Sequence, residues 1–359
     1  MILASRNHLD GPLLIALLML SGLSLIVLYS AGGGNGDLIW RQFIRLSVAI
    51  LVMVAIAYTR IDSIQRWSPH VFSAGLLLLG LVLLVGIVGK GAQRWLDLGF
   101  FRFQPAEIMK LGVPMMTAWV LARRPLPASN WTIVLSLVVV CLPTGLVVLQ
   151  PDLGTAILIA MSGLVVIFVA GLKWRYIIAT SGLLFAAAPL MWFNLHAYQQ
   201  RRILTLFDPY SDPLGAGYHT IQSTIAVGAG GFYGKGWIHG TQSQLEFIPE
   251  RSTDFVFAVF AEEFGLLGSM LLLLIYLFII GRCLIIAFNA RDTYARLLCA
   301  SLAWTFFVYV FVNIGMVTGI LPVVGVPLPL ISYGGTSMVT LMAGFGIVMS
   351  VHTHKRLMT

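Results

Sequence analysis

Long apolar stretches separated by shorter polar segments dominate the chain. Ten of them stand out, at about residues 13–30, 44–58, 71–89, 105–122, 132–149, 153–170, 176–195, 255–280, 297–320 and 332–351. A transmembrane helix needs about 20 mostly apolar residues, and the second stretch is shorter than this. The first stretch lacks a small-residue cleavage pattern and is expected to stay as a membrane anchor. The pattern predicts an all-α polytopic membrane protein with about ten transmembrane helices, or eight or nine if the second stretch does not span.

The composition supports this class and excludes others. Hydrophobic residues make up 58% of the 359 residues and charged residues 10%, with a mean hydropathy of +0.92, whereas soluble domains carry about 25% charged residues. The net charge of +8 would suit a nucleic-acid-binding protein, but the sequence has no basic stripe interleaved with aromatic residues. We therefore expect no nucleic-acid partner.

The distribution of charge predicts which side of the membrane each loop faces. With the N-terminus inside the cell, the inner segments hold twelve basic and three acidic residues, a net charge of +9, and the outer segments have a net charge of −1. Cytoplasmic loops are enriched in Lys and Arg. Both termini are therefore expected inside, and residues 1–359 are expected to form a single transmembrane domain.

Two outer segments differ from short loops. The longest connection, about residues 196–254 between the seventh and eighth predicted helices, contains consecutive turn signals and a predicted short interfacial helix around Ile221 and Ile225. A connection of this length in a compact protein is usually functional. Residues 321–331 are apolar and contain three prolines, and irregular backbone at a membrane face must be buried in protein or line a wet cavity.

Ionisable side chains in apolar stretches are costly and mark candidate functional sites. Glu107 and Lys110 lie in the first two turns of the fourth predicted helix, Asp152 opens the sixth, and Asp254 opens the eighth. Ser332 opens the tenth. Even-numbered helices begin at the outer face in the expected topology, so these side chains are predicted to lie at one depth on one side of the membrane.

Each of these residues also has a purely structural interpretation. Acids are favoured in the first turn of a helix, which suits Glu107 and Asp152. Glu107 and Lys110 have the i, i+3 spacing of an ion pair, and Asp254, or Thr253 before it, is a candidate N-cap. Three arginines are expected at the same outer surface: Arg94, Arg102 and Arg251. Taken together, these groups favour a polar vestibule for a ligand with phosphates and hydroxyls, since helix N-termini also attract anions.

Two further features carry weaker signals. Residues 228–236, GAGGFYGKG, are similar to a phosphate-binding loop but lack the Gly at 229 and the Ser or Thr at 236 that the Walker pattern needs. Close approach of this backbone to a ligand is expected instead of nucleotide binding. Glu262 and Glu263 lie two turns into the eighth predicted helix, and at least one of them is expected to face the interior, as a structural hydrogen-bond partner or as part of a polar path.

Residues 313–337 (NIGMVTGILPVVGVPLPLISYGGTS) resemble the signature of the SEDS family of shape, elongation, division and sporulation proteins, which includes RodA, FtsW and SpoVE. Shorter matches to the family occur at residues 90–97, 104–107, 150–155, 208–254 and 352–354. The resemblance therefore covers nearly the whole chain. Residues 240–247 and the short C-terminus are most similar to the elongation branch, RodA.

The resemblance implies a peptidoglycan glycosyltransferase in the bacterial cytoplasmic (inner) membrane, with its active site on the outer, periplasmic side. Such an enzyme polymerises lipid II during cell elongation, beside a class B penicillin-binding protein that supplies the transpeptidase. The family's essential carboxylate corresponds to Asp254, and Glu107, Lys110 and Asp152 match its other important positions. No cofactor is firmly implied; a divalent cation is compatible with the chemistry, but the sequence shows no ligand set for one.

The reaction agrees with the placement of these residues. A sugar hydroxyl must attack the anomeric carbon of the donor as undecaprenyl pyrophosphate departs, which calls for a general base, and this role is assigned to Asp254. The departing pyrophosphate needs cations. The candidates are Arg94, Arg102, Lys110 and Arg251. Trp95 and Ser332 are further candidate substrate contacts from the matched motifs, and the polyprenyl tails are expected in lipid-facing grooves between helices.

Two other functions stay open at this point. A lipid II flippase, a role also proposed for the family, would need important polar groups through the whole depth of the membrane. The predicted groups instead cluster on the outer side, except for Glu262 and Glu263. A scaffold that merely recruits the penicillin-binding protein would leave the buried charges unexplained.

Overall fold

The computed structural model describes residues 9–355, apart from positions 90–91, 98, 100–101, 177, 179–181, 183–185, 188, 190–191, 194–199, 201–203, 214, 216, 246 and 249. The seventh predicted stretch, residues 176–195, and the first part of the long connection after it lie largely outside the described residues. The other nine predicted stretches all correspond to helices.

The long helices are α1 (Gly11–Ala31), α2 (Gly36–Ala57), α3 (Ile61–Val85), α4 (Pro105–Ala122), α5 (Asn130–Leu149), α6 (Leu153–Val169), α11 (Val256–Phe288), α12 (Thr293–Val317) and α13 (Thr336–Lys355). Seven helices in the described residues are long and apolar enough to cross a membrane, and α6 is a shorter apolar helix. The prediction of an all-α polytopic membrane protein is confirmed.

The second helix is longer than its apolar stretch. It begins at Gly36, after Asn35, whose side chain accepts hydrogen bonds from the N–H groups of Asp37 and Leu38. The helix has 22 residues. Its first turns carry polar residues, which interrupt the apolar pattern but are compatible with a helix. The second predicted stretch was short because it left out these polar residues, and the helix itself is long enough to span a membrane.

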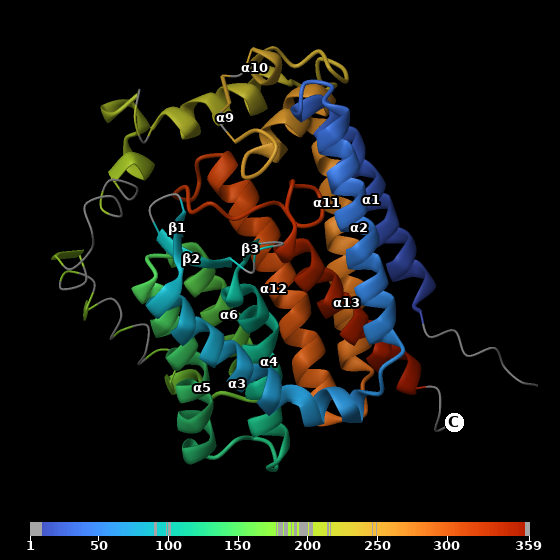
Figure 1. The fold of residues 1–359 in the computed structure, drawn as a ribbon, viewed down its shortest axis with the longest axis vertical. Coiled ribbons are helices and arrows are strands. Elements are labelled where there is room, and N and C mark those ends of the chain that lie inside the picture. Colours follow the sequence, from blue (N-terminus) through green and yellow to red (C-terminus); the bar gives the residue numbers. More distant parts are fainter. Residues whose placement is uncertain are drawn as a thin grey trace, which may run out of the picture.

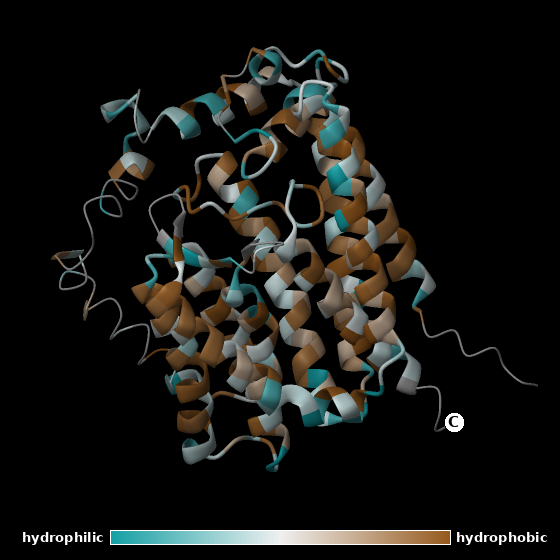
Figure 2. Ribbon diagram, in the orientation of Figure 1, coloured by the Kyte–Doolittle hydropathy of each residue, from teal (hydrophilic) through white to brown (hydrophobic). Residues whose placement is uncertain are grey.

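The helices form two groups that lie side by side (Figure 1). One apolar core joins α1, α2, α11, α12 and α13, and a second joins α3, α4, α5 and α6 with the first turns of α12. Large apolar side chains are also exposed on the outside of the bundle, including Leu84 at 81% and Leu77 at 76%. Figure 2 shows the same distribution, with hydrophobic residues along the helices and hydrophilic ones concentrated near their ends. An apolar exterior of this kind suits contact with lipid.

Both ends of the described chain lie at the same end of the bundle. Asp10 caps α1 by accepting from Leu13 N, and its carboxylate also pairs with Arg282 of α11 at 2.6 Å and with His352 of α13 at 3.5 Å. Burial acts to raise the pKa of Asp10, but the hydrogen bonds from Arg282 and Leu13 and the charges of Arg282 and His352 hold it below its ordinary value of 3.8. Both termini on one side fit an even number of membrane crossings.

The opposite end carries the long connections, and we call it the loop end. A small antiparallel sheet of β1 (Ile87–Gly89), β2 (Ala92–Asp97) and β3 (Arg102–Phe103) follows α3, so the last residues of the stretch predicted at about 71–89 form a strand and not helix. The connection before α11 contains η1 (Pro209–Ser211), α9 (Tyr218–Ala229) and α10 (Thr241–Gln244), which lie across this end (Figure 1). The short helix predicted around residues 221 and 225 is therefore confirmed as α9.

Candidate active site

The first turns of α4 hold a buried ion pair. Glu107 and Lys110 are 5% and 6% exposed, and Lys110 Nζ lies 2.7 Å from Glu107 Oε1. The ammonium also lies 5.1 Å from the centre of the Tyr309 ring on α12. The other carboxylate oxygen, Glu107 Oε2, is buried without a hydrogen-bond partner. The structural interpretation as an ion pair is confirmed, and the unpaired oxygen leaves one buried acceptor available.

Asp152 caps α6, as predicted, and joins three elements at the loop end. Its Oδ1 accepts from Thr155 N at 3.2 Å, and its Oδ2 accepts from Gln104 Nε2 at 3.2 Å just before α4. Arg94 on β2 pairs with the same Oδ2 at 3.4 Å and donates to Pro151 O. The sheet, α4 and α6 therefore meet at this carboxylate, and Arg94 neutralises it.

Asp254 lies in the turn before α11 and is half-buried. The N-cap position of α11 is held by Phe255, without a side-chain hydrogen bond, so the interpretation of Asp254 or Thr253 as the N-cap was wrong. The main-chain oxygen of Asp254 accepts from Asn313 Nδ2 at 2.9 Å, and the same amide donates to Val326 O at 2.7 Å. The turn is thus fixed through its backbone.

Ser332 fixes the same turn from the other side. Its Oγ donates to Thr253 O at 2.5 Å and accepts from Leu328 N at 2.8 Å, and Tyr333 N donates to Ser252 O at 2.8 Å. Ser332 is 3% exposed and lies four residues before α13, not at its start as predicted. Its Oγ contacts are with the backbone of residues 253 and 328, so it holds the turn that carries Asp254.

The proline-rich segment, residues 321–335, contacts both Asp254 and the first turn of α6, which Asp152 caps. A Cβ on Gly154, in the first turn of α6, would lie 2.9 Å from Val324 O, and a Cβ on Gly325 would lie 3.4 Å from Asp254 Oδ2. On α12, Tyr309 faces Lys110, and Asn313, one turn later, holds the Asp254 turn. The predicted convergence of Glu107, Lys110, Asp152 and Asp254 is therefore supported by contacts through shared neighbours.

The remaining candidates are distributed around this centre. Arg251 donates to Ser243 O and lies near Gly33 in the turn between α1 and α2, away from the pair on α4. Arg102 lies in β3, but its side chain is outside the described part of the chain. Trp95 on β2 lines a groove between the two helix groups. These placements leave Arg94 and Lys110 as the cations that contact the acidic residues named above.

The groove has a volume of about 1200 Å³ and runs between α2 and α13 on one side and α3 and α4 on the other. Its lining reaches from Thr59 and Ser63 at one end of the bundle to Trp95, Phe103 and Gly335 at the loop end. Nearly all of the lining is apolar. A long hydrocarbon chain is the ligand that such a surface suits.

Arg45 at the loop end of this groove was not among the residues predicted from the sequence. Its guanidinium lies 4.3 Å from the centre of the Tyr333 ring and beside Gly335, just before α13. A positive charge next to a helix N-terminus favours a bound anion. The signal was present as a basic residue just inside the second apolar stretch, but its direction depends on how α2 packs against α13.

Glu262 and Glu263 are both buried, at 0% and 1% exposure, which confirms that at least one faces the interior. No group of three or more His, Cys, Asp and Glu side chains that could hold a metal ion occurs in the described residues. The backbone of residues 228–236 approaches α11, as shown below.

The comparisons with known proteins agree with this geometry. The family model for FtsW, RodA and SpoVE, described as "Cell cycle protein", matches residues 11–357. Over 99% of its length the chain is 51% identical to "Peptidoglycan glycosyltransferase MrdB" of Escherichia coli K12, of which the match covers 96%. It is 32% identical to "Stage V sporulation protein E" of Bacillus subtilis, over 97% of this chain and 98% of that protein.

Solved structures show the same fold. The chain matches one from a structure described as "Structural coordination of polymerization and crosslinking by a peptidoglycan synthase complex" with a TM-score of 0.86 and 36% identity, over 99% of this chain and 100% of that one. It also matches the rod shape determining protein RodA of Thermus thermophilus with a TM-score of 0.74 and 31% identity, over 97% and 98% of the two chains.

Proposed function

Because this chain belongs to the FtsW/RodA/SpoVE family of cell cycle proteins, we propose that it is a peptidoglycan glycosyltransferase that polymerises lipid II during cell elongation. The observation that carries the proposal is the likeness, over almost the full length, to proteins named peptidoglycan glycosyltransferase. The geometry supports it, because a half-buried acid, a buried lysine and a long apolar groove lie at one end of a membrane bundle.

In this proposal Asp254 is the general base. Its carboxylate takes the proton of the 4-hydroxyl of the acceptor GlcNAc, whose oxygen bonds to the anomeric carbon of the donor MurNAc. The bond from that carbon to the pyrophosphate breaks at the same centre, and undecaprenyl pyrophosphate leaves. The turn that carries Asp254 is held through its backbone by Asn313 and Ser332, which fixes the place from which its side chain would act.

Cations and the groove would bind the rest of the substrate. Lys110, Arg94 and Arg45 are the candidates for the pyrophosphate, since charge that develops on a leaving group is best stabilised by fixed positive groups. The polyprenyl chain would lie in the groove between α2, α3, α4 and α13, which Arg45 borders at the loop end. Glu107 and Asp152 would hold Lys110 and Arg94 in position.

The orientation and the partner are part of the same proposal. The excess of positive charge in the segments that include Asp10, Arg282 and His352 assigns that end to the cytoplasm, so the loop end faces the periplasm of a bacterial inner membrane. A class B penicillin-binding protein is the proposed partner, in keeping with the resemblance to a chain from a peptidoglycan synthase complex. It would crosslink the strands that this enzyme makes.

The test is a purified assay with fluorescent lipid II, with and without the penicillin-binding protein. We expect wild-type protein to produce glycan strands that a muramidase degrades. Reconstituted liposomes with lipid II in one leaflet provide the opposing measurement. Translocation of lipid II without any polymer would overturn the proposal in favour of a flippase.

A further inference from the structure

The helix α11 is interrupted close to the candidate active site. Gly265 has φ +65° and ψ −161°, which separates a short outer piece, residues 256–264, from the long inner piece that follows. Asp254 lies directly before the outer piece. A break of this kind leaves main-chain carbonyl and N–H groups without helical partners, and buried backbone groups need other partners.

The glycine-rich segment 230–236 supplies these partners. Lys235 N and Gly236 N donate to the carbonyls of Glu262 and Glu263 at 3.0 Å each. On the other side of the break, Leu266 N donates to Gly231 O at 3.0 Å, and Leu267 N donates to Phe232 O at 3.2 Å. Both sides of the break in α11 are thus bonded to the long connection.

Glycines are needed in segment 230–236 because its backbone is in direct contact with the backbone of α11. A Cβ on Gly230 would lie 2.0 Å from Ala261 O, and one on Gly234 would lie 2.1 Å from Glu263 O. A Cβ on Gly265 would likewise lie 2.3 Å from Gly234 N. The motif that resembled a phosphate loop is explained by this close contact with α11.

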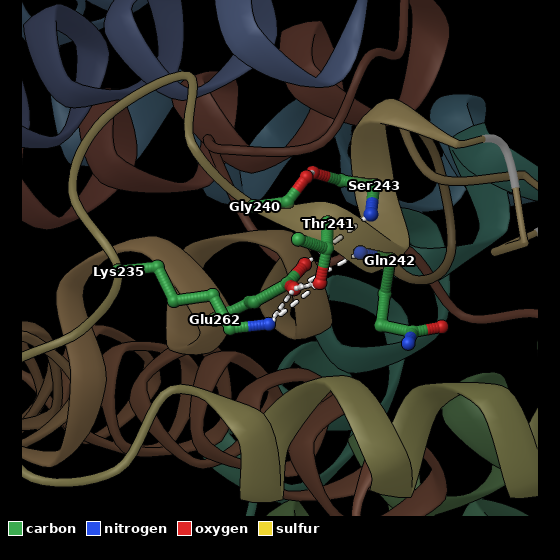
Figure 3. Close-up of polar contacts among 6 residues, drawn as sticks. All are labelled: Lys235, Gly240, Thr241, Gln242, Ser243 and Glu262. Carbon is green, nitrogen blue, oxygen red and sulfur yellow. Dashed lines mark hydrogen bonds and ion pairs between the residues drawn. The ribbon is translucent and has the colours of Figure 1, made fainter.

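The buried side chain of Glu262 adds a second link between the outer piece and the connection (Figure 3). Its Oε1 accepts from Lys235 Nζ at 2.8 Å, Thr241 Oγ1 at 3.1 Å and Gln242 N at 3.0 Å, and its Oε2 accepts from Ser243 N at 3.2 Å. Each carboxylate oxygen is therefore occupied by groups of this chain. A buried charge with several donors is held in one geometry.

Ser243 passes this link to the candidate active site. Its N–H is held by Glu262, and its carbonyl accepts from the guanidinium of Arg251, three residues before Asp254. Ser243 is itself fully buried. The position of Arg251, and with it the start of the turn that carries Asp254, depends on the peptide that Glu262 fixes.

We propose that Glu262 is a positioning residue for the glycosyl transfer, which sets the Asp254 turn by holding residues 241–243 against the outer piece of α11. This inference rests on the proposed function. Glu262 touches no substrate in it and acts only through Ser243 and Arg251. Its loss should therefore lower turnover more than it lowers affinity for lipid II.

The test compares Glu262→Gln with Glu263→Gln in the full-length protein. Glu263 is an adjacent, equally buried carboxylate whose side chain accepts from Ser30 of α1 and from the backbone of Ile238, and not from residues 241–243. For Glu262→Gln we expect kcat to fall at least about tenfold with KM changed by less than about threefold. Hydrogen exchange of the Gln242 and Ser243 amides should accelerate in the same variant. Glu263→Gln should leave kcat and both amides close to wild type.

The outcomes separate the inference from the proposed function. If Glu262→Gln is folded and its kcat stays within about twofold of wild type, or if Glu263→Gln loses as much, the positioning role is wrong. If Glu262→Gln does not fold, Lys235→Met and Thr241→Val each remove one donor to Glu262 together with the Lys235–Thr241 contact, and unchanged kcat in both overturns the role. A wild-type protein that makes no glycan contradicts the proposed function, whereas the amide exchange still tests the link from Glu262 to Ser243.

Discussion

Gly325 lies directly beside the carboxylate of Asp254. A Cβ on Gly325 would be 3.4 Å from Asp254 Oδ2, and Gly325 has a φ of +74°. This φ is one that residues with a side chain adopt at a cost. The proline-rich segment thus presents backbone without a side chain to the proposed base.

Gly325→Ala is expected to reduce polymerisation strongly. The left-handed conformation costs an alanine about 1–2 kcal/mol, and the segment can relieve it only by moving relative to Asp254. A displacement of a catalytic group by about 1 Å can lower the rate by up to roughly 100-fold, so we expect a loss of roughly 10- to 100-fold. The measurement is glycan synthesis from lipid II, with thermal unfolding in detergent to show that the protein is folded. Gly80→Ala on α3, where a Cβ meets nothing within 4 Å, is the control and should be fully active.

Asp254→Asn is expected to be folded but inactive. The backbone contacts from Asn313 and Ser332 do not involve the carboxylate, and Phe255 holds the N-cap position, so the helix does not lose a cap. Removal of a general base lowers the rate by about 10²- to 10⁴-fold. Asp37→Asn, at an exposed aspartate in the first turn of α2, should be active. A folded Asp254→Asn protein that polymerises normally would contradict the assignment.

Much of this site could be predicted from the sequence. Asp152 caps α6 and Glu107 pairs with Lys110 because helix starts and i, i+3 spacings follow local rules. The topology then brings the starts of α4, α6 and α11 to one end, so the acids were expected near one another. Local pattern and the length of the helices were sufficient for these conclusions.

Other features depend on contacts between distant segments. Arg45 turns toward Tyr333 only because α2 packs against α13, and the strands of the small sheet are two to six residues long, too short to show an alternating pattern. Gly265 follows Glu262 and Glu263 at the start of a long apolar run, and glycine is common in transmembrane helices. Nothing local distinguishes it from a helical glycine, since the break is stabilised by residues 230–236.

The ion pair on α4 allows stability and function to be separated. Lys110→Met leaves Glu107 as a buried charge without its cation, which is expected to lower the free energy of unfolding by about 3–5 kcal/mol. The double variant Glu107→Gln/Lys110→Met should recover most of this stability, because two neutral side chains replace the pair. Polymerisation should stay at least about tenfold below wild type in both, since no cation is left beside Tyr309 for the leaving group. Recovery of activity together with stability would show that the pair is only structural.

The cluster of Asp10, Arg282 and His352, at the end of the bundle opposite the loop end, should affect stability and leave the rate of glycosyl transfer unchanged. The pKa of Asp10 is lowered in the folded protein, so its contribution is present above the unfolded pKa of about 3.9 and is lost as the pH falls through the folded pKa. Asp10→Asn is therefore expected to lower the free energy of unfolding by roughly 1–3 kcal/mol at pH 7, and the difference from wild type should shrink below about pH 4.

Thermal unfolding across this pH range measures the effect of Asp10→Asn. Asp62→Asn is the matched control, because Asp62 and Arg60 form an ion pair with side chains that are 62% and 74% exposed. Exposed pairs contribute at most about 1 kcal/mol. Glycan synthesis by folded Asp10→Asn protein should be unchanged, since this cluster lies at the end of the bundle away from Asp254. A pH-independent difference from wild type would exclude the carboxylate charge as the cause.

The groove gives a prediction that depends on the length of the lipid. Ala343, two turns into α13, lines the groove farther from its loop end than Gly335, and Ala343→Trp should fill the space in which the polyprenyl chain is proposed to lie. KM for lipid II with its full tail should rise by about fivefold or more, because apolar contacts are lost. A lipid II analogue with a short prenyl tail should be nearly unaffected, since it does not reach the blocked part. Leu84→Trp, at an α3 residue that is 81% exposed and outside the groove, adds the same side chain without blocking it. Equal effects on both substrates would mean that Ala343→Trp disturbs the packing of α13 and not the binding of the tail.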